Sequence, residues 1–163
     1  MTASSPYRYW LVNDDDACRE LQHDLLQRYC HLQCTGSYRS ADAALLELTK
    51  VMHPHLILMD VSLPGTDGVA AIPLVRALAP KVPILMLTTF TDPLVERAVL
   101  AAGASAYLAK WSSLDELVCA IEEAISKPVP VPIATQLAAP RLIAPRRSWL
   151  QTLQSRLAGI LNS

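Results

Sequence analysis

Five short apolar segments, each followed by a segment with helical periodicity, constrain this chain more than any other feature. The apolar segments are Tyr7–Val12, Leu32–Tyr38, Leu56–Met59, Ile84–Leu87 and Ala106–Ala109. The third and fourth are continuously apolar, which is typical of strands buried on both faces. Strands joined through helices run parallel, and the helices then cover both faces of the sheet. The pattern predicts an α/β fold with five parallel strands.

The helical segments between these strands carry start and stop signals. Ser40 is suited to cap a helix over residues 41–52, and Ser113 with Glu116 forms a capping box before the last helix. Pro73 falls inside the third helical segment, where its missing N–H and its ring would cost about 3 kcal/mol. We therefore expect that helix to begin late or to bend at the proline.

The charge of the chain is divided between two unlike parts. Residues 1–125 hold all 15 acidic residues and nine basic ones, a net charge of −6, whereas residues 126–163 hold five basic residues and no acidic one. Five of the 12 prolines also lie beyond residue 126, and proline favours extended linkers. We predict a folded domain over residues 1–126, a proline-rich linker over 127–147 and a basic amphipathic C-terminal helix over 148–163.

Composition excludes several classes of protein. The overall charge of −1 argues against a chain that coats nucleic acid. The longest apolar runs are far below the roughly 20 residues that a membrane-spanning helix needs, and the first residues do not resemble a secretory signal, so we expect a cytoplasmic protein. The four cysteines form no CxxC pair, which favours free thiols over a disulfide framework or a zinc site.

Polar residues follow four of the predicted strands at their carboxyl ends, where parallel sheets gather ligand chemistry. The run Asn13-Asp14-Asp15-Asp16 follows the first strand, Asp60 the third, Thr88 the fourth and Lys110 the fifth. Carboxylates this close together repel one another, and a hard divalent cation such as Mg²⁺ would stabilise their charged forms. A lysine beside them can hold a phosphoryl oxygen or pair with a carboxylate.

Two segments that carry these residues resemble a known family. Leu58–Gly68 resembles the phosphoacceptor segment of the receiver domains of bacterial two-component response regulators, and Gly103–Lys110 resembles their fifth-strand signature. The resemblance spans about residues 7–126 and is closest to receivers that precede helix-turn-helix output domains. It implies a flavodoxin-like doubly wound sheet of strand order 2-1-3-4-5 with five helices, here followed by a short C-terminal helical tail.

The resemblance also implies roles for single residues. Asp60 would be the phosphoacceptor, taking a phosphoryl group from the phosphohistidine of a kinase. Thr88 and Lys110 would bond the acyl phosphate, and Tyr107 would be the aromatic switch that responds together with Thr88. Such chemistry needs little beyond positioning and charge neutralisation.

The cofactor implied by the resemblance is Mg²⁺, held by Asp14, Asp60 and the backbone carbonyl of Ser62. The family usually has two acids at the first strand end, but here the pair reads Asn13-Asp14 if Arg19 is the arginine often found in the first helix. Asn13 would then weaken metal binding. Asp15 either compensates or, in a register shifted by one, forms the pair with Asp14.

The implied partners are a sensor histidine kinase or phosphotransfer protein, a downstream protein effector and a second copy of the chain in a homodimer. We expect a stand-alone switch rather than an enzyme, and no direct DNA binding by this chain alone. The alternative is a degenerate receiver that acts as a phosphorylation-independent interaction module. A haloacid dehalogenase would need an acid at Ser62, and no GxGxxG turn for a dinucleotide is present.

Overall fold

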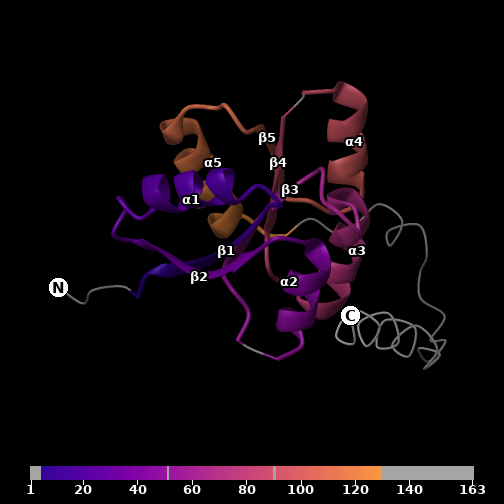
Figure 1. Ribbon diagram of the computed structural model, residues 1–163, viewed down its shortest axis with the longest axis horizontal. Coiled ribbons are helices and arrows are strands. Elements are labelled where there is room, and N and C mark those ends of the chain that lie inside the picture. Colours follow the sequence, from indigo (N-terminus) through magenta and orange to yellow (C-terminus); the bar gives the residue numbers. More distant parts are fainter. Residues whose placement is uncertain (1–4, 51, 90, 130–163) are drawn as a thin grey trace.

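The computed structural model describes residues 5–50, 52–89 and 91–129, which form a five-stranded parallel sheet in the order β2-β1-β3-β4-β5 (Figure 1). The strands are β1 Tyr7–Val12, β2 Leu32–Tyr38, β3 Leu56–Asp60, β4 Ile84–Thr88 and β5 Ala106–Ala109. The helices are α1 Asp16–Leu26, α2 Ala41–Leu48, α3 Gly68–Leu78, α4 Pro93–Ala101 and α5 Leu114–Ser126. The predicted flavodoxin-like α/β fold and its strand order are confirmed. The predicted linker over 127–147 and helix over 148–163 lie almost entirely outside the described residues.

Helices cover both faces of the sheet, with α1 and α5 on one side and α2, α3 and α4 on the other (Figure 1). Each side has its own apolar cluster, because successive side chains of a strand point to opposite faces. On the α1–α5 side the cluster includes Leu11 and Leu58. On the α2–α4 side it includes Val12 and Met59. The strands are therefore buried on both faces, as their continuous apolar sequence predicts.

Two helices differ from the predicted ones. The helix expected over residues 41–52 ends at Leu48, and the Thr49 hydroxyl donates to the carbonyl oxygen of Leu46 at 2.7 Å. The third helix does not begin late, since it starts at Gly68 with Asp67 as its cap, and it continues through Pro73 to Leu78. Pro73 is exposed on the solvent side of α3, so its ring enters no packed surface. The buried apolar face of the helix outweighs the one backbone hydrogen bond that the proline removes.

Arg76 on α3 hydrogen-bonds to the turn before β4 and to the turn after α4. Its Nε and Nη2 donate to the carbonyl oxygen of Gly103 at 2.9 and 2.6 Å, and its Nη1 donates to the carbonyl oxygen of Val82. Burial lowers the pKa of Arg76 to about 10. The guanidinium group thereby satisfies two main-chain acceptors that apolar neighbours could not.

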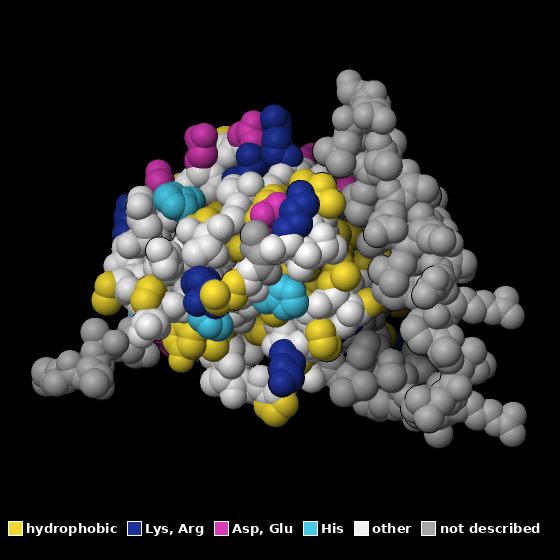
Figure 2. Space-filling view, turned by 90° about the horizontal axis from the view of Figure 1, so that it is seen from below, with side chains coloured by type: hydrophobic (Ala, Val, Ile, Leu, Met, Phe, Trp, Pro, Cys, Tyr) yellow, Lys and Arg dark blue, Asp and Glu magenta, His cyan; other side chains and the backbone are white. Residues whose placement is uncertain are grey.

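The described surface carries no dominant feature on the face shown in Figure 2. Hydrophobic side chains occur there in small groups among basic, acidic and histidine side chains. Among residues 5–50, 52–89 and 91–129, no helix has the length and apolar character that crossing a membrane requires.

Candidate functional site

The strand register brings the polar residues together at the carboxyl end of the sheet. Val12 pairs with Met59, so the residues that follow them, Asn13 and Asp60, stand side by side. The ladder continues at this end, since the Asn13 N–H donates to the carbonyl oxygen of Tyr38 at 3.0 Å. Adjacent strands lie about 4.8 Å apart, so the two side chains are close neighbours.

Asp60 is the last residue of β3 and is only 3% exposed. Its Oδ2 accepts a hydrogen bond from Lys110 Nζ at 2.5 Å, and its Oδ1 accepts one from the Ser62 N–H at 3.2 Å. A buried carboxylate is costly unless it is paired and hydrogen-bonded. The lysine and the backbone amide meet that requirement.

Thr88 ends β4 and Lys110 directly follows β5, the two strands beyond β3 in the sheet. Thr88 is buried, and its carbonyl oxygen accepts the Lys110 N–H at 2.7 Å, which holds the base of the lysine beside β4. Alternation along the strands places Asn13, Asp60 and Lys110 on the α1–α5 face. Thr88 falls on the opposite face with Tyr107, whose half-buried ring packs against the apolar cluster of that side. The structure thus assembles the predicted residues at one end of the sheet, divided between its two faces.

The four residues after β1, Asn13 to Asp16, have different structural roles. Asn13 is buried, and its Oδ1 accepts the N–H of Asp15 at 3.1 Å. Asp15 caps α1, with its Oδ1 accepting the N–H of Cys18 at 3.1 Å. Asp14 is exposed at the same end of the sheet. Because the Asp15 carboxylate is engaged by the helix, Asp14 is the acid of this run that remains available for a cation.

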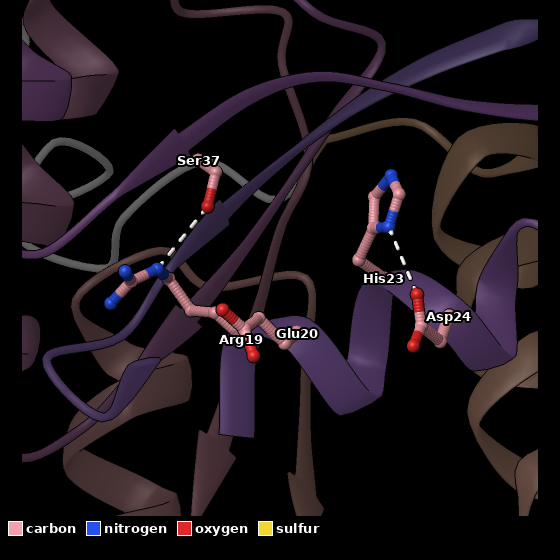
Figure 3. A pocket seen from close by; sticks show the side chains of 5 residues that line it. All are labelled: Arg19, Glu20, His23, Asp24 and Ser37. Atoms are coloured by element: carbon pink, nitrogen blue, oxygen red, sulfur yellow. Dashed lines mark hydrogen bonds and ion pairs between the residues drawn. The ribbon is translucent and has the colours of Figure 1, made fainter. Parts of the chain in front are cut away.

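Asp16 and Arg19 lie in the first turn of α1. The Asp16 carboxylate pairs with Arg19 and, at 3.0 Å, with Arg39. Arg19 also donates to the carbonyl oxygen of Asn13 at 2.5 Å and to Ser37 Oγ at 3.2 Å. Figure 3 shows Arg19 and Ser37 on one side of an open pocket of about 370 Å³ whose other lining residues, Glu20, His23 and Asp24, continue along α1. The hydrogen bond from Arg19 holds the backbone of Asn13 in place.

The loop after Asp60 is shaped by Gly65, as the family segment implies, and is held by a tether from α2. Gly65 adopts a φ of 74°, which glycine accepts without strain. Asp42, 24 residues earlier, accepts from the Thr66 hydroxyl at 2.6 Å and from the Thr66 N–H at 3.3 Å. A Cβ on Gly68 would lie 2.1 Å from the carbonyl oxygen of Asp60. The family segment Leu58–Gly68 signalled Gly65, Thr66 and Gly68, whereas nothing in the sequence signalled the role of Asp42.

Cys18 is a further neighbour that sequence reasoning missed. Burial raises the pKa of the Cys18 thiol, while the charge of Lys110 offsets part of that rise and Asp60 adds to it. The thiol therefore lies close enough to Lys110 and Asp60 for both charges to affect its pKa. No motif signalled this proximity, because it arises from the way α1 packs over the end of the sheet.

The oxygen atoms at this end of the sheet suit Mg²⁺, which takes only a few of its ligands from the protein. They do not suit a cation whose ligands all come from protein side chains. Within the described parts of the chain, no group of three or more His, Cys, Asp or Glu side chains is arranged to hold a metal ion. Mg²⁺ commonly takes one or two carboxylates and completes its shell with carbonyls and water. Asp14, Asp60 and the carbonyl of Ser62 are a donor set of that kind.

A doubly wound parallel sheet with a buried aspartate and a paired lysine at the carboxyl ends of its strands defines a class of α/β proteins, and comparison with known proteins assigns the family. Residues 10–122 match the model of the response regulator receiver domain, so the chain belongs to the response regulator receiver family.

Relatives in this family include the transcriptional regulatory protein LnrK of Bacillus subtilis, 36% identical over 111 residues, covering 68% of this chain and 50% of LnrK. The transcriptional regulatory protein PdtaR of Mycobacterium tuberculosis is 43% identical over 128 residues, covering 77% of this chain and 60% of PdtaR. The receiver domain of the response regulator NarL from M. tuberculosis superposes with a TM-score of 0.69 at 26% identity, covering 75% of this chain and 98% of the NarL domain. The chain thus spans between 24% and 60% of the length of the curated relatives it matches.

Proposed function

We propose that this receiver accepts a phosphoryl group on Asp60 from a histidine kinase or phosphotransfer protein in the cytoplasm, and that phosphorylation switches its binding to a partner. The observation that carries the proposal is the Asp60 carboxylate itself. It is buried at the end of β3, with Lys110 Nζ 2.5 Å from Oδ2 and the Ser62 amide on Oδ1. Family membership supports the same reading.

In the transfer, a carboxylate oxygen of Asp60 forms a bond to phosphorus while the bond from phosphorus to the donor nitrogen breaks. Lys110 already donates to this carboxylate, and it would follow the added charge by donating to a phosphoryl oxygen. Thr88, at the next strand end, offers a hydroxyl to the same group. Mg²⁺, held by Asp14, Asp60 and the Ser62 carbonyl, would supply charge neutralisation.

Incubation with acetyl phosphate and Mg²⁺, followed by intact mass measurement, tests the proposal. The wild type should gain one phosphoryl adduct and Asp60→Asn none. Asp67→Asn is a matched control, because Asp67 lies in the same loop but caps α3, and asparagine caps about as well as aspartate. A wild type without any adduct would leave the phosphorylation-independent interaction module as the function.

We propose that the output passes through the surface formed by α4, β5 and α5. Leu94 on α4 and Trp111 after β5 are 71% and 62% exposed and offer apolar contact area on this surface. The basic segment beyond residue 126 complements the −6 charge of residues 1–125 and would cover this surface in the same chain or in a dimer mate. Removing residues 130–163 should then raise the amide exchange of α4 and α5 or change the solution mass; no change in either would refute this assignment.

A further inference from the structure

One hydrogen bond fixes the orientation of the Asn13 amide. Its Oδ1 accepts the Asp15 N–H at 3.1 Å. Turning the amide by 180° would place the Nδ2 hydrogens against that N–H, so the contact fixes which end of the amide is the oxygen. The other end, Nδ2, is a hydrogen-bond donor.

This donor has no partner. Asn13 is 2% exposed, and within the described residues its Nδ2 is a buried nitrogen that makes no hydrogen bond. Burial raises the pKa of the Cys18 thiol, which lies close enough that a hydrogen bond from the Asn13 side chain offsets part of that rise. Nδ2 nevertheless makes no contact to it with hydrogen-bond geometry, and a sulfur atom is a weak acceptor. A buried donor left unpaired is costly, so an unpaired amide beside the phosphoacceptor indicates a ligand that fills the place.

The neighbours of the amide specify the kind of ligand. The register places Asn13 beside Asp60 on the same face of the sheet. An N–H donor cannot coordinate a cation, but it can donate to an anionic oxygen, and such charge-assisted bonds are the strong ones. The oxygen-rich group that would occupy this place is the phosphoryl group on Asp60.

We propose that Asn13 is a phosphoryl-binding residue, whose Nδ2 donates a hydrogen bond to an oxygen of the group carried by Asp60. The inference rests on the proposed function, and it deepens it. Where the family usually has a carboxylate that serves the metal, this chain has a donor that serves the anion. Compared with a carboxylate at this position, Asn13 should weaken the binding of the cation and strengthen the binding of the phosphoryl group.

Two titrations test the proposal on the full chain. In the first, Mg²⁺ affinity is measured by calorimetry for wild type, Asn13→Ala and Asn13→Asp. Asn13→Ala should bind Mg²⁺ at least as tightly as wild type, and Asn13→Asp more tightly. Weaker Mg²⁺ binding by Asn13→Ala would show that an oxygen of Asn13 serves the metal, which overturns the proposal.

In the second titration, beryllofluoride stands in for the phosphoryl group at saturating Mg²⁺, with the bound anion followed by fluorine NMR. A lost hydrogen bond to an anion corresponds to about tenfold or more, so both Asn13 variants should bind beryllofluoride at least about tenfold more weakly. Asn13→Asp keeps the acceptor for the Asp15 N–H and so guards against a fold defect. Unchanged affinity in both variants overturns the proposal.

A third variant and one comparison complete the test. Cys18→Ala removes the thiol next to the amide and should leave beryllofluoride affinity unchanged; a loss equal to that of Asn13→Ala would mean that the amide serves the thiol, against the proposal. A wild type that is phosphorylated by acetyl phosphate but shows no effect of Asn13 refutes this inference alone. A wild type that takes neither phosphoryl group nor beryllofluoride refutes the proposed function as well.

Discussion

Replacing Gly68 with alanine tests how closely α3 approaches the phosphoacceptor. The new Cβ would lie 2.1 Å from the carbonyl oxygen of Asp60 and 2.8 Å from that of Val61. Ordinary contacts of this kind are about 3.4 Å, so the start of α3 or the end of β3 must move by more than 1 Å. Overpacking of this size costs about 1–3 kcal/mol, and alanine regains at most about 1 kcal/mol of helix propensity.

We therefore expect Gly68→Ala to lower the free energy of unfolding by about 2 kcal/mol, measured by urea denaturation. The displacement also moves Asp60 away from Lys110, and a 1 Å misplacement can cost about 100-fold in rate. Phosphorylation by acetyl phosphate should slow accordingly.

Ala70→Gly is the matched control, because Ala70 is exposed on the same helix. It should cost about 1 kcal/mol through helix propensity and leave the phosphorylation rate unchanged. A Gly68→Ala variant within 0.5 kcal/mol of wild type, an order-of-magnitude threshold for surface substitutions, and with a normal rate would refute the reasoning.

Three further predictions concern the metal, pH and the fold. Asp14→Ala should abolish the Mg²⁺-dependent change in tryptophan fluorescence, whereas Asp15→Ala should keep it and lose about 1 kcal/mol of stability through the α1 cap; the reverse ranking would place the acid pair one residue later. Burial, and then the charge of Arg8, lower the pKa of His55 from 6.5. The folded state therefore resists protonation, and the free energy of unfolding should fall as pH drops below about 6.5. His55→Asn should make this pH dependence weaker, and an equal slope in both proteins would count against the prediction. Arg76→Leu should lower the free energy of unfolding by about 2–3 kcal/mol without changing the phosphorylation rate, and a slower rate would show that α3 anchoring reaches the site.

The fold was predictable because each element carries a local signal. The continuous apolar segments at 56–59 and 84–87 coincide with β3 and β4, which each extend one residue further, to Asp60 and Thr88. The extension follows from ladder pairing, since Asp60 stands opposite Leu87 and Thr88 opposite Ala109. Pairing of this kind depends on neighbouring strands and leaves no trace in hydropathy.

The site was predictable as a set of residues but not as a set of contacts. Strand ends in a parallel sheet identify Asp60 and Lys110, because topology alone brings them together. The tether from Asp42 to Thr66 and the proximity of Cys18 depend on how helices pack, which has no period along the chain. The direction of the Asn13 amide depends on one N–H two residues later, and residue identity cannot reveal it.

The division of the site between the two faces of the sheet has a consequence for how such a protein can diverge over generations. Asp60 and Lys110 belong to the α1–α5 face, and Thr88 and Tyr107 to the α2–α4 face, with one layer of backbone between them. Substitutions in the apolar cluster under one face do not touch the cluster under the other, so the two faces can accept changes separately. Thr88 is the exception in the function proposed above, because its hydroxyl reaches the phosphoryl group on Asp60 while its side chain belongs to the second face, and its replacement would affect both faces at once.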